Sequence, residues 1–497
     1  MSRSRLPEGL YRAASVRELD RIAIEELKIS GATLMARAGR AALDVLVRVW
    51  PGAKTIVVVC GAGNNAGDGY VVARLAKEQE MNVRVAELGD PARLRGDARD
   101  ARLALTDSGV QPAPFDAQSL HGVAVVVDAI FGTGLDRTVE GTWAAAIACL
   151  NAAAAPILAL DVPSGLNADT GRVMGEAVRA DDTVSFIGLK QGAFTADGPE
   201  RCGRVHFDDL RVPESLYQRR PPDAWLDRLE QFRGVLGTRP RGAHKGRFGH
   251  VLVIGGDSGY LGAARLAGEA ALRCGAGLIS VASRAAHAQV INAGRPEIMG
   301  HGAETKSELK PLIERASVLA VGPGLGKTGW AKRMLEAALD AGKPLVLDAD
   351  GLNLLAEKKH AALPPDSVIT PHPGEAGRLL LSDSAKVEAD RFAAISSLVE
   401  RYQCVCVLKG AGTLTAAPKG QSHVCADGNP GMATGGMGDV LTGVIVALMA
   451  QGLKAETAAR AGVCLHARAG DLAAGGLERG TLASDLMPHL RVLINGI

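Results

Sequence analysis

The sequence has few aromatic residues and almost no excess of charge. Phe, Trp and Tyr make up 3% of its 497 residues, and 56 basic residues nearly balance 54 acidic ones, for a formal net charge of +2. Nucleic-acid-binding proteins typically carry a basic face or stacking aromatic side chains, and proteins that bind membrane surfaces carry basic patches. The composition therefore predicts neither a nucleic-acid partner nor a membrane partner.

Several other common patterns are missing. The eight Cys residues are scattered, without a CxxC pair or a zinc-ligand spacing. The first residues, MSRSRLPEGLYRAAS, contain no apolar signal core, and no apolar run is long enough to span a membrane. The sequence has no GxxxxGK[ST] motif, which excludes a P-loop nucleotide site. Unpaired thiols without a secretion signal predict a cytoplasmic protein.

Glycine, in contrast, is abundant, with 61 residues, many of them directly after short apolar runs. Continuous β-branched runs such as residues 54–60 predict strands that are buried on both faces. Strands alternate with helices in both halves of the chain, which predicts two α/β domains with mostly parallel sheets. We expect these domains at residues 1–215 and 232–497. A segment with several prolines separates them, and we place the linker at residues 216–231.

Polar residues follow three predicted strands of the first half. The first strand leads into a Gly-rich loop with Asn65, ahead of a helix expected over residues 70–79, and the next two end in Asp128 and Asp161. Because the carboxyl ends of parallel strands line one crevice, these side chains and Ser164 are expected to converge there. In a single loop of this kind, the polar side chains could equally form hydrogen bonds to the loop's own backbone. Polar residues at the ends of successive strands favour a ligand-binding site instead.

The stretch NPGMATGGMGDVLTGVIVALMA, residues 429–450, combines glycines, one carboxylate and a buried helix. Glycines let the backbone approach a ligand closely, and the free N–H groups of a helix N-terminus bind anions. Asp439, expected at or near the helix start, is placed to take a proton from a hydroxyl. A lone GxGD pattern fits a helix cap better than a base, so its meaning depends on the other motifs.

Two further segments complete the parts of a phosphoryl-transfer site. The loop KGAGT, residues 409–413, offers N–H groups and a hydroxyl to a nucleotide, and residues 435–438 offer an anion hole. Glu375 offers a carboxylate for Mg²⁺. Positioning and charge neutralisation of this kind are what phosphoryl transfer requires.

Taken together, the motifs resemble two known families. HKGRFGHVLVIGG, GAARLAGEAALRCGAGL, VGPGLG, LDADGLNLL, TPHPGEAGRLL, LKGAGT and NPGMATGGMGDVLTG resemble the ADP-dependent NAD(P)H-hydrate dehydratases. GNNAGDGYVVARLA, VVDAIFGTGL and LDVPSG resemble the NAD(P)H-hydrate epimerases. The resemblance implies an N-terminal Rossmann-like αβα domain that interconverts (R)- and (S)-NAD(P)HX. It also implies a C-terminal ribokinase-like αβα domain that converts (S)-NAD(P)HX to NAD(P)H, with ADP converted to AMP and phosphate.

The resemblance also implies roles for individual residues of the first domain. Asp161 would transfer a proton at C6 of the hydrated ring, and K⁺ would be bound by Asn65, Asp128 and Ser164. The residues expected to bind the hydrated dinucleotide are Asn64, Asn65, Ala66, Gly67, Asp68, Gly132, Thr133, Gly134, Leu135, Asp136, Arg137, Thr138 and Asp161.

In the second domain, the resemblance makes Asp439 the catalytic base. The hydrate would be contacted by Ala263, Gly324, His372 and Asp439. The residues expected to bind ADP are Lys409, Gly410, Ala411, Gly412, Thr413 and Gly438. Related kinases commonly carry an NxxE element near Mg²⁺, whereas this chain has His372-Pro373-Gly374-Glu375, so Glu375 is a candidate Mg²⁺ ligand only.

Two alternatives stay open at this point. The chain could be a plain kinase of a small alcohol or vitamin precursor, with a non-catalytic N-terminal domain that binds nucleotide or a partner. Alternatively, the first domain could be only a scaffold. The resemblance also leads us to expect a homo-oligomer, with a tetramer as one candidate, and leaves open the preference between NADHX and NADPHX.

Overall fold

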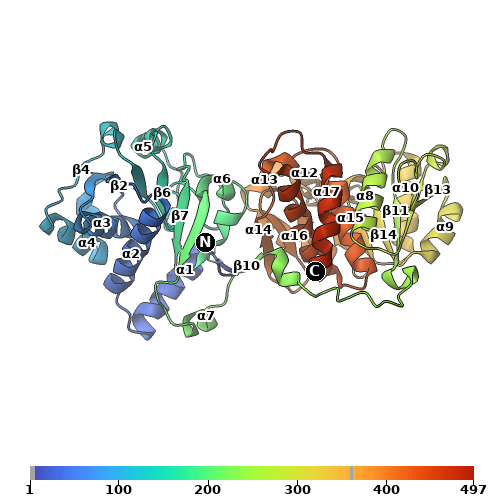
Figure 1. The fold of residues 1–497 in the computed structure, drawn as a ribbon, viewed down its shortest axis with the longest axis horizontal. Helices are drawn as coiled ribbons and strands as arrows, with labels where there is room; N and C mark the ends of the chain where they lie inside the picture. Colours follow the sequence, from blue (N-terminus) through green and yellow to red (C-terminus); the bar gives the residue numbers. More distant parts are fainter. Residues whose placement is uncertain (1–5, 359–361) are drawn as a thin grey trace. The chain divides into compact units, whose positions relative to one another are not determined.

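The computed structural model describes residues 6–358 and 362–497, and its chain divides into two compact units (Figure 1). The first unit is Met1–Leu226 and the second is Asp227–Ile497. The boundary falls inside the segment where we expected the linker. Each unit is an α/β fold with parallel strands, as the sequence predicted.

The first unit is organised around a parallel sheet with the strand order β4-β3-β2-β5-β6-β7-β9. Alternate residues of its central strand β2 belong to two different cores, Val58 to one and Val57 to the other, which explains the unbroken apolar run. The strands are β2 (Thr55–Cys60), β3 (Asn82–Glu87), β4 (Ala113–Pro114), β5 (Val125–Ala129), β6 (Ile157–Leu160), β7 (Asp182–Phe186) and β9 (Arg204–Asp208).

Helices cover both faces of this sheet. The core on one face contains residues of α2 (Gly31–Val49), α3 (Asn64–Glu78) and α4 (Gly96–Asp107), whereas the core on the other contains residues of α5 (Gly141–Asn151). The remaining short elements are α1 (Ala13–Arg21), β1 (Gly9–Tyr11), β8 (Leu189–Lys190), α6 (Gly198–Cys202), α7 (Ser215–Arg219) and β10 (Ala224–Asp227).

Helix α3 begins six residues earlier than the sequence suggested, at Asn64 instead of residue 70. Gly67 and Gly69, which were interpreted as loop residues, lie inside the helix and let it pack closely. A Cβ at Gly69 would lie 2.6 Å from Cβ of Ala129, and one at Gly67 would lie 2.5 Å from Cε of Met35. Asn64 and Asn65 therefore form the first turn of a helix rather than the middle of a loop.

The second unit contains a sheet with the order β13-β12-β11-β14-β15-β16-β17-β18-β19. Its strands are parallel up to β17, and β17, β18 and β19 then pair antiparallel. They are β11 (His250–Ile254), β12 (Leu278–Ser283), β13 (Ile298–Gly302), β14 (Val318–Val321), β15 (Leu345–Leu347), β16 (Val368–Ile369), β17 (Val405–Leu408), β18 (Thr413–Ala416) and β19 (Ser422–Cys425).

Both faces of this second sheet are also covered. Val251 and Val253 of β11 pack in one core with the helices α8 (Leu261–Arg273), α15 (Met437–Ala450), α16 (Ala455–Ala474) and α17 (Leu486–Leu493). Leu252 and Ile254, which alternate with them, are equally buried. The further helices are α9 (Lys306–Arg315), α10 (Gly329–Asp340), α11 (Ala349–Ala356), α12 (Pro373–Leu379), α13 (Ser384–Ala389) and α14 (Arg391–Tyr402).

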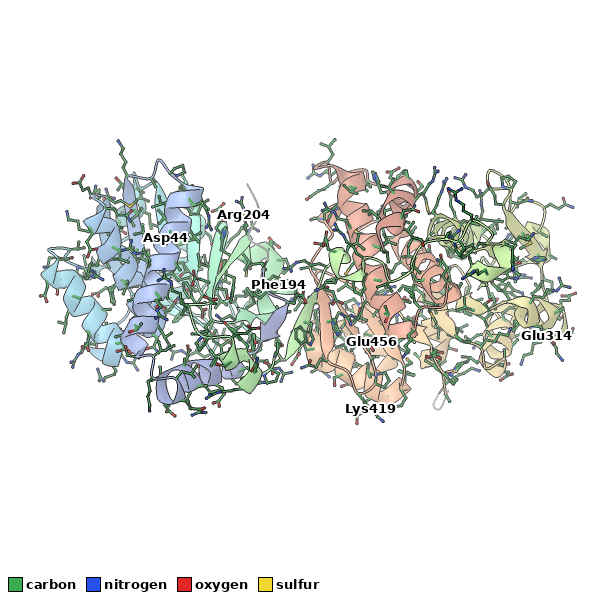
Figure 2. The ribbon with its side chains drawn as sticks, turned by 60° about the horizontal axis from the view of Figure 1, so that its bottom comes forward. Asp44, Phe194, Arg204, Glu314, Lys419 and Glu456 are labelled. Carbon is green, nitrogen blue, oxygen red and sulfur yellow. The ribbon has the colours of Figure 1, made fainter. Side chains whose placement is uncertain are left out.

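Charged side chains lie at the outside of the second unit, as Glu314 and Lys419 show in Figure 2. Within the part of the chain that the structure describes, no helix combines the length and the apolarity that a membrane span requires.

Candidate active sites

In the first unit, three of the predicted residues meet around the backbone of Phe131. Asp128 is the last residue but one of β5 and is fully buried, and its Oδ1 accepts a hydrogen bond from Oγ of Ser164 at 2.6 Å. The same Oγ accepts from the N–H of Phe131 at 2.8 Å. Nδ2 of Asn65 donates to the carbonyl oxygen of Phe131 at 2.9 Å. The convergence expected from the strand ends is therefore present for Asn65, Asp128 and Ser164.

One buried polar atom of this cluster lacks a hydrogen-bond partner in the described part of the chain. Oδ1 of Asn65 is buried and has no hydrogen-bond partner among the residues that the structure describes. Burial raises the pKa of Asp128 to about 6, against the hydrogen bonds from Ser164 that lower it. An unsatisfied buried amide oxygen costs free energy unless a ligand takes it. Amide, carboxylate and carbonyl oxygens are the donors that hard cations accept, so the residues fit the expected K⁺ ion.

Asp161 follows β6 and is held by a buried lysine. Its backbone has a φ of 69°, in the left-handed region that Asp tolerates better than most residues. The ammonium of Lys190 donates to Oδ1 of Asp161, to the carbonyl oxygen of Phe186 at 3.0 Å and to Oγ of Ser185 at 3.3 Å. The Lys190 side chain is 1% exposed. The sequence analysis did not assign Lys190, although its position next to a buried strand was a usable signal.

Two more carboxyl groups share this environment. Burial raises the pKa of Asp68 well above its usual range, and the charges of Asp161 and Asp20 add to the shift. Burial also raises the pKa of Asp20 to about 6, while Lys190 opposes the shift. Asp68 was predicted to bind substrate. Asp20 lies within α1, where no sequence motif marked it.

The loop of residues 132–138 passes beside Asp161. A Cβ at Gly132 would lie 3.5 Å from Oδ2 of Asp161 and 3.4 Å from Cβ of Asn65. Further along the loop, Leu135, Arg137 and Thr138 line a cavity of about 230 Å³ together with Phe131 and Trp143. The cavity thus adjoins the candidate K⁺ site, because Phe131 contributes to both.

In the second unit, Asp439 lies in the first turn of α15, after Gly436 with a φ of 93°. A Cβ at Gly438 would lie 3.4 Å from Nζ of Lys409 and 3.5 Å from Oδ2 of Asp348. Burial raises the pKa of Asp439 to about 7, with a further contribution from Asp348 and an opposing one from Lys409. A carboxyl group that titrates near neutral pH is suited to act as a general base.

Lys409 and Asp348 form a buried pair next to this helix start. Nζ of Lys409 donates to Oδ1 of Asp348 at 2.6 Å and lies 3.8 Å from Oε2 of Glu375. Oδ2 of Asp348 accepts from Oγ1 of Thr442, one turn into α15, at 2.9 Å. Burial lowers the pKa of Lys409, but the charges of Asp348, Glu375 and Asp439 raise it overall. Asp348, which the sequence analysis missed, belongs to the quoted motif LDADGLNLL.

Glu375 has a structural use at the start of α12. Its Oε2 accepts from the N–H of His372 at 2.9 Å, and Nδ1 of His372 accepts from the N–H of Gly374 at 3.0 Å. The two residues thus form a capping box. Burial raises the pKa of Glu375 to about 7. Across residues 6–358 and 362–497, no three His, Cys, Asp or Glu side chains gather as a metal ion would require. These contacts use Oε2 of Glu375 for the cap, and its role as a Mg²⁺ ligand stays a prediction.

Gly324 and Ala263 are neighbours in space. Gly324 has a φ of 59°, and a Cβ there would lie 3.1 Å from Cβ of Ala263 and 2.4 Å from the carbonyl oxygen of Tyr260. Only glycine fits at this position. The neighbouring strands β14, β15, β16 and β17 are each followed, within three residues, by Gly324, Asp348, His372 and Lys409 in turn. Their carboxyl ends therefore bring these residues to one edge of the sheet.

The buried side chain of Arg391, which is 1% exposed, supports the loop of residues 409–413. Its Nη2 donates to the carbonyl oxygens of Leu408 and Lys409, each at 3.2 Å. Oγ1 of Thr413 donates to the carbonyl oxygen of Gly410 at 2.9 Å. The loop connects β17 to β18. Its first residue, Lys409, has a side chain that extends to Gly438 at the start of α15.

Comparison with known proteins gives matches over nearly the whole chain. A family model described as NAD(P)H-hydrate dehydratase matches residues 251–491, and one described as YjeF-related protein N-terminus matches residues 31–192. The chain is 49% identical over 490 residues to a bifunctional NAD(P)H-hydrate repair enzyme of Coxiella burnetii, covering 98% of this chain and 99% of that protein. It is 41% identical over 503 residues to one of Escherichia coli, covering 99% and 95%. A solved structure of a hypothetical protein from Streptococcus mutans matches with a TM-score of 0.51 and 28% identity, over 54% of this chain and 99% of that chain.

Proposed function

The chain belongs to the family of bifunctional NAD(P)H-hydrate repair enzymes, and from that premise we propose how its own residues perform the two reactions. The first unit interconverts the (R) and (S) hydrates, and the second dehydrates the (S) hydrate with ADP. One observation supports this division best. Each unit has its own cluster of buried titratable groups, around Asp161 in the first and Asp439 in the second.

In the second unit, Asp439 accepts the proton of the 6-hydroxyl group as this oxygen attacks the β-phosphate of ADP. A bond forms between the hydroxyl oxygen and phosphorus, and AMP leaves. The phosphate then departs from C6 while a proton leaves C5, which restores the double bond of NAD(P)H. The free N–H groups at the start of α15, beside Gly438, stabilise the transferring phosphate.

The neighbouring residues support this base. Lys409 neutralises Asp348 and keeps the pKa of Asp439 from rising further. Asp348 joins Lys409 to Thr442 and so fixes the helix start relative to the sheet. Residues 410–413 contact ADP from the neighbouring loop. Glu375 caps α12 through Oε2 and would hold Mg²⁺ through its other carboxylate oxygen.

In the first unit, Asp161 transfers protons to and from the C6 oxygen. The hydroxyl group leaves C6 as water while the ring nitrogen supplies electrons, and water adds back on the opposite face. Lys190 fixes the position of the Asp161 carboxylate, and the carboxyl groups of Asp68 and Asp20, whose pKa values are raised, interact with its charge. Asn65, Asp128 and Ser164 would hold a K⁺ ion, which would supply positive charge for the substrate phosphates. The loop of residues 132–138 covers the dinucleotide.

We expect ADP to support faster dehydration than ATP. The glycine loop alone cannot count phosphates, so this expectation comes from the family and not from the geometry. Steady-state rates with each nucleotide at matched Mg²⁺ concentration test it. A clear preference for ATP would refute it.

We expect Asn65→Ala to weaken K⁺ binding about 10- to 100-fold, the usual effect of disturbing a metal site. The reason is that its Oδ1 is the unpaired buried oxygen of the cluster. The measurement is the K⁺ concentration that gives half-maximal epimerisation. Asn82→Ala is the matched control, because Asn82 is an exposed asparagine of the same unit that belongs to no predicted site. An unchanged K⁺ response in Asn65→Ala would refute the cation site.

A further inference from the structure

The second unit also contains a cavity, and the proposed reactions do not yet use it. Its volume is about 390 Å³, and its lining includes Tyr260, Arg284, Lys327 and Asp350. Small-molecule sites typically measure about 300–1,000 Å³. The cavity is therefore large enough for part of a dinucleotide.

The cavity begins where the hydrated ring must lie. The carbonyl oxygen and Cβ of Tyr260 lie against Gly324, which in turn touches Ala263. At the other side, Oδ2 of Asp350 accepts from the N–H of Gly326 at 2.9 Å, and the charge of Asp350 raises the pKa of Asp439. If the hydrated ring contacts Ala263, Gly324 and Asp439, the rest of the dinucleotide can therefore extend into this cavity.

The acidic groups of the cavity are already satisfied. Asp257 is 4% exposed, and its two carboxylate oxygens accept from Nη1 of Arg284 at 2.9 Å, the N–H of Ser258 at 2.8 Å and Oγ1 of Thr328 at 2.8 Å. Arg284 is also paired with Glu304. Neither Asp257 nor Arg284 is available to bind a ligand by charge without giving up these contacts.

Lys327 differs from these groups. It lines the cavity, is exposed, and forms no ion pair with any residue in the described part of the chain. Tyr260 is 61% exposed at the same cavity, in a chain with only 3% aromatic residues. An ammonium group without an ion pair and an exposed aromatic ring that line one cavity can together bind a phosphate and an adjoining base or sugar.

We propose that this cavity binds the phosphate-bearing part of the hydrated dinucleotide, remote from the reacting ring, with Lys327 contacting a phosphate and Tyr260 packing against the nucleoside. The proposal rests on the dehydratase function proposed for this unit. ADP is not the occupant. The cavity is built after β11, β12, β14 and β15, whereas the loop expected to bind ADP follows β17, and β16 lies between them.

The test compares Lys327→Met and Tyr260→Ala with the wild-type full-length protein in steady-state dehydration. Both side chains are exposed, so both variants are expected to fold. We expect Lys327→Met to raise the KM for (S)-NADHX about tenfold with little change in kcat, since a charged hydrogen bond is lost. The KM for ADP stays unchanged. Lys332→Met is the control, because this exposed lysine pairs with Glu357 instead of lining the cavity.

A truncated substrate makes the test specific. With hydrated reduced nicotinamide riboside, which has no phosphate, Lys327→Met and the wild type should have the same KM. A larger KM for both NADHX and NADPHX assigns Lys327 to the pyrophosphate, and one confined to NADPHX assigns it to the additional ribose phosphate. The proposal is overturned if the KM for both dinucleotide hydrates is unchanged, if the riboside is affected equally, or if the KM for ADP rises. A wild type that dehydrates none of these compounds contradicts the proposed function instead.

Discussion

Asp439→Asn is expected to abolish dehydration and to leave the protein folded. The variant keeps the shape of the side chain but cannot accept the proton of the 6-hydroxyl group, and the loss of a general base costs about 10²- to 10⁴-fold in rate. Folding should survive because the Asp439 carboxylate makes no hydrogen bond within residues 6–358 and 362–497. The measurements are kcat for dehydration and the temperature of thermal unfolding.

The pH dependence gives the same prediction a second readout. The pKa of Asp439 is about 7, raised by burial, so the group is protonated and inactive as a base below that pH. The wild-type rate should therefore rise as pH increases through about 7 and then level off. The exposed Asp340→Asn serves as the control and should keep both rate and profile. Turnover near the wild-type value in Asp439→Asn would show that another group is the base.

Asp161→Ala is expected to stop the consumption of a mixed hydrate at about the fraction that is already the (S) epimer. The second unit should act on one epimer only, because the attacking oxygen must lie in line with the phosphate of ADP. The first unit supplies that epimer through Asp161, whose carboxylate Lys190 holds beside Gly132. In this variant, the (R) hydrate should be consumed only as fast as it converts spontaneously to the (S) hydrate.

Chiral separation of the residual hydrate decides this prediction. We expect the residue in Asp161→Ala to be the (R) epimer, whereas Asp100→Ala, which changes an exposed carboxylate, should leave none. Asp161→Asn keeps a polar partner for Lys190 and separates loss of chemistry from loss of structure. If Asp161→Ala consumes both epimers at the wild-type rate, Asp161 is not needed for epimerisation. Its role would then be structural, as a support of the turn at residues 163–165.

Much of the fold follows from local sequence patterns. Continuous apolar runs identified strands such as β11 and β14 because residues buried on both faces must all be apolar. The meeting of Asn65, Asp128 and Ser164 also followed, because parallel strands end at one edge.

The start of α3 and several site residues could not be predicted in this way. Gly67 and Gly69 suggested a loop, but their lack of a side chain serves close packing against elements distant in sequence. Lys190, Asp20 and Asp348 become part of the sites only through contacts with residues far along the chain. The antiparallel pairing of β18 with β17 was also not predicted, although the two strands are consecutive in the chain. The homo-oligomer and the cytoplasmic location stay predictions.

The most direct test follows NADH absorbance in the near ultraviolet after ADP is added to a mixture of both hydrate epimers and the full-length chain. The account predicts a rise to complete recovery of NADH, because one unit keeps supplying the epimer that the other consumes. Omission of ADP should give no rise. No rise with ADP, or a lasting plateau at the initial (S) fraction, would contradict the claim that this one chain carries both activities.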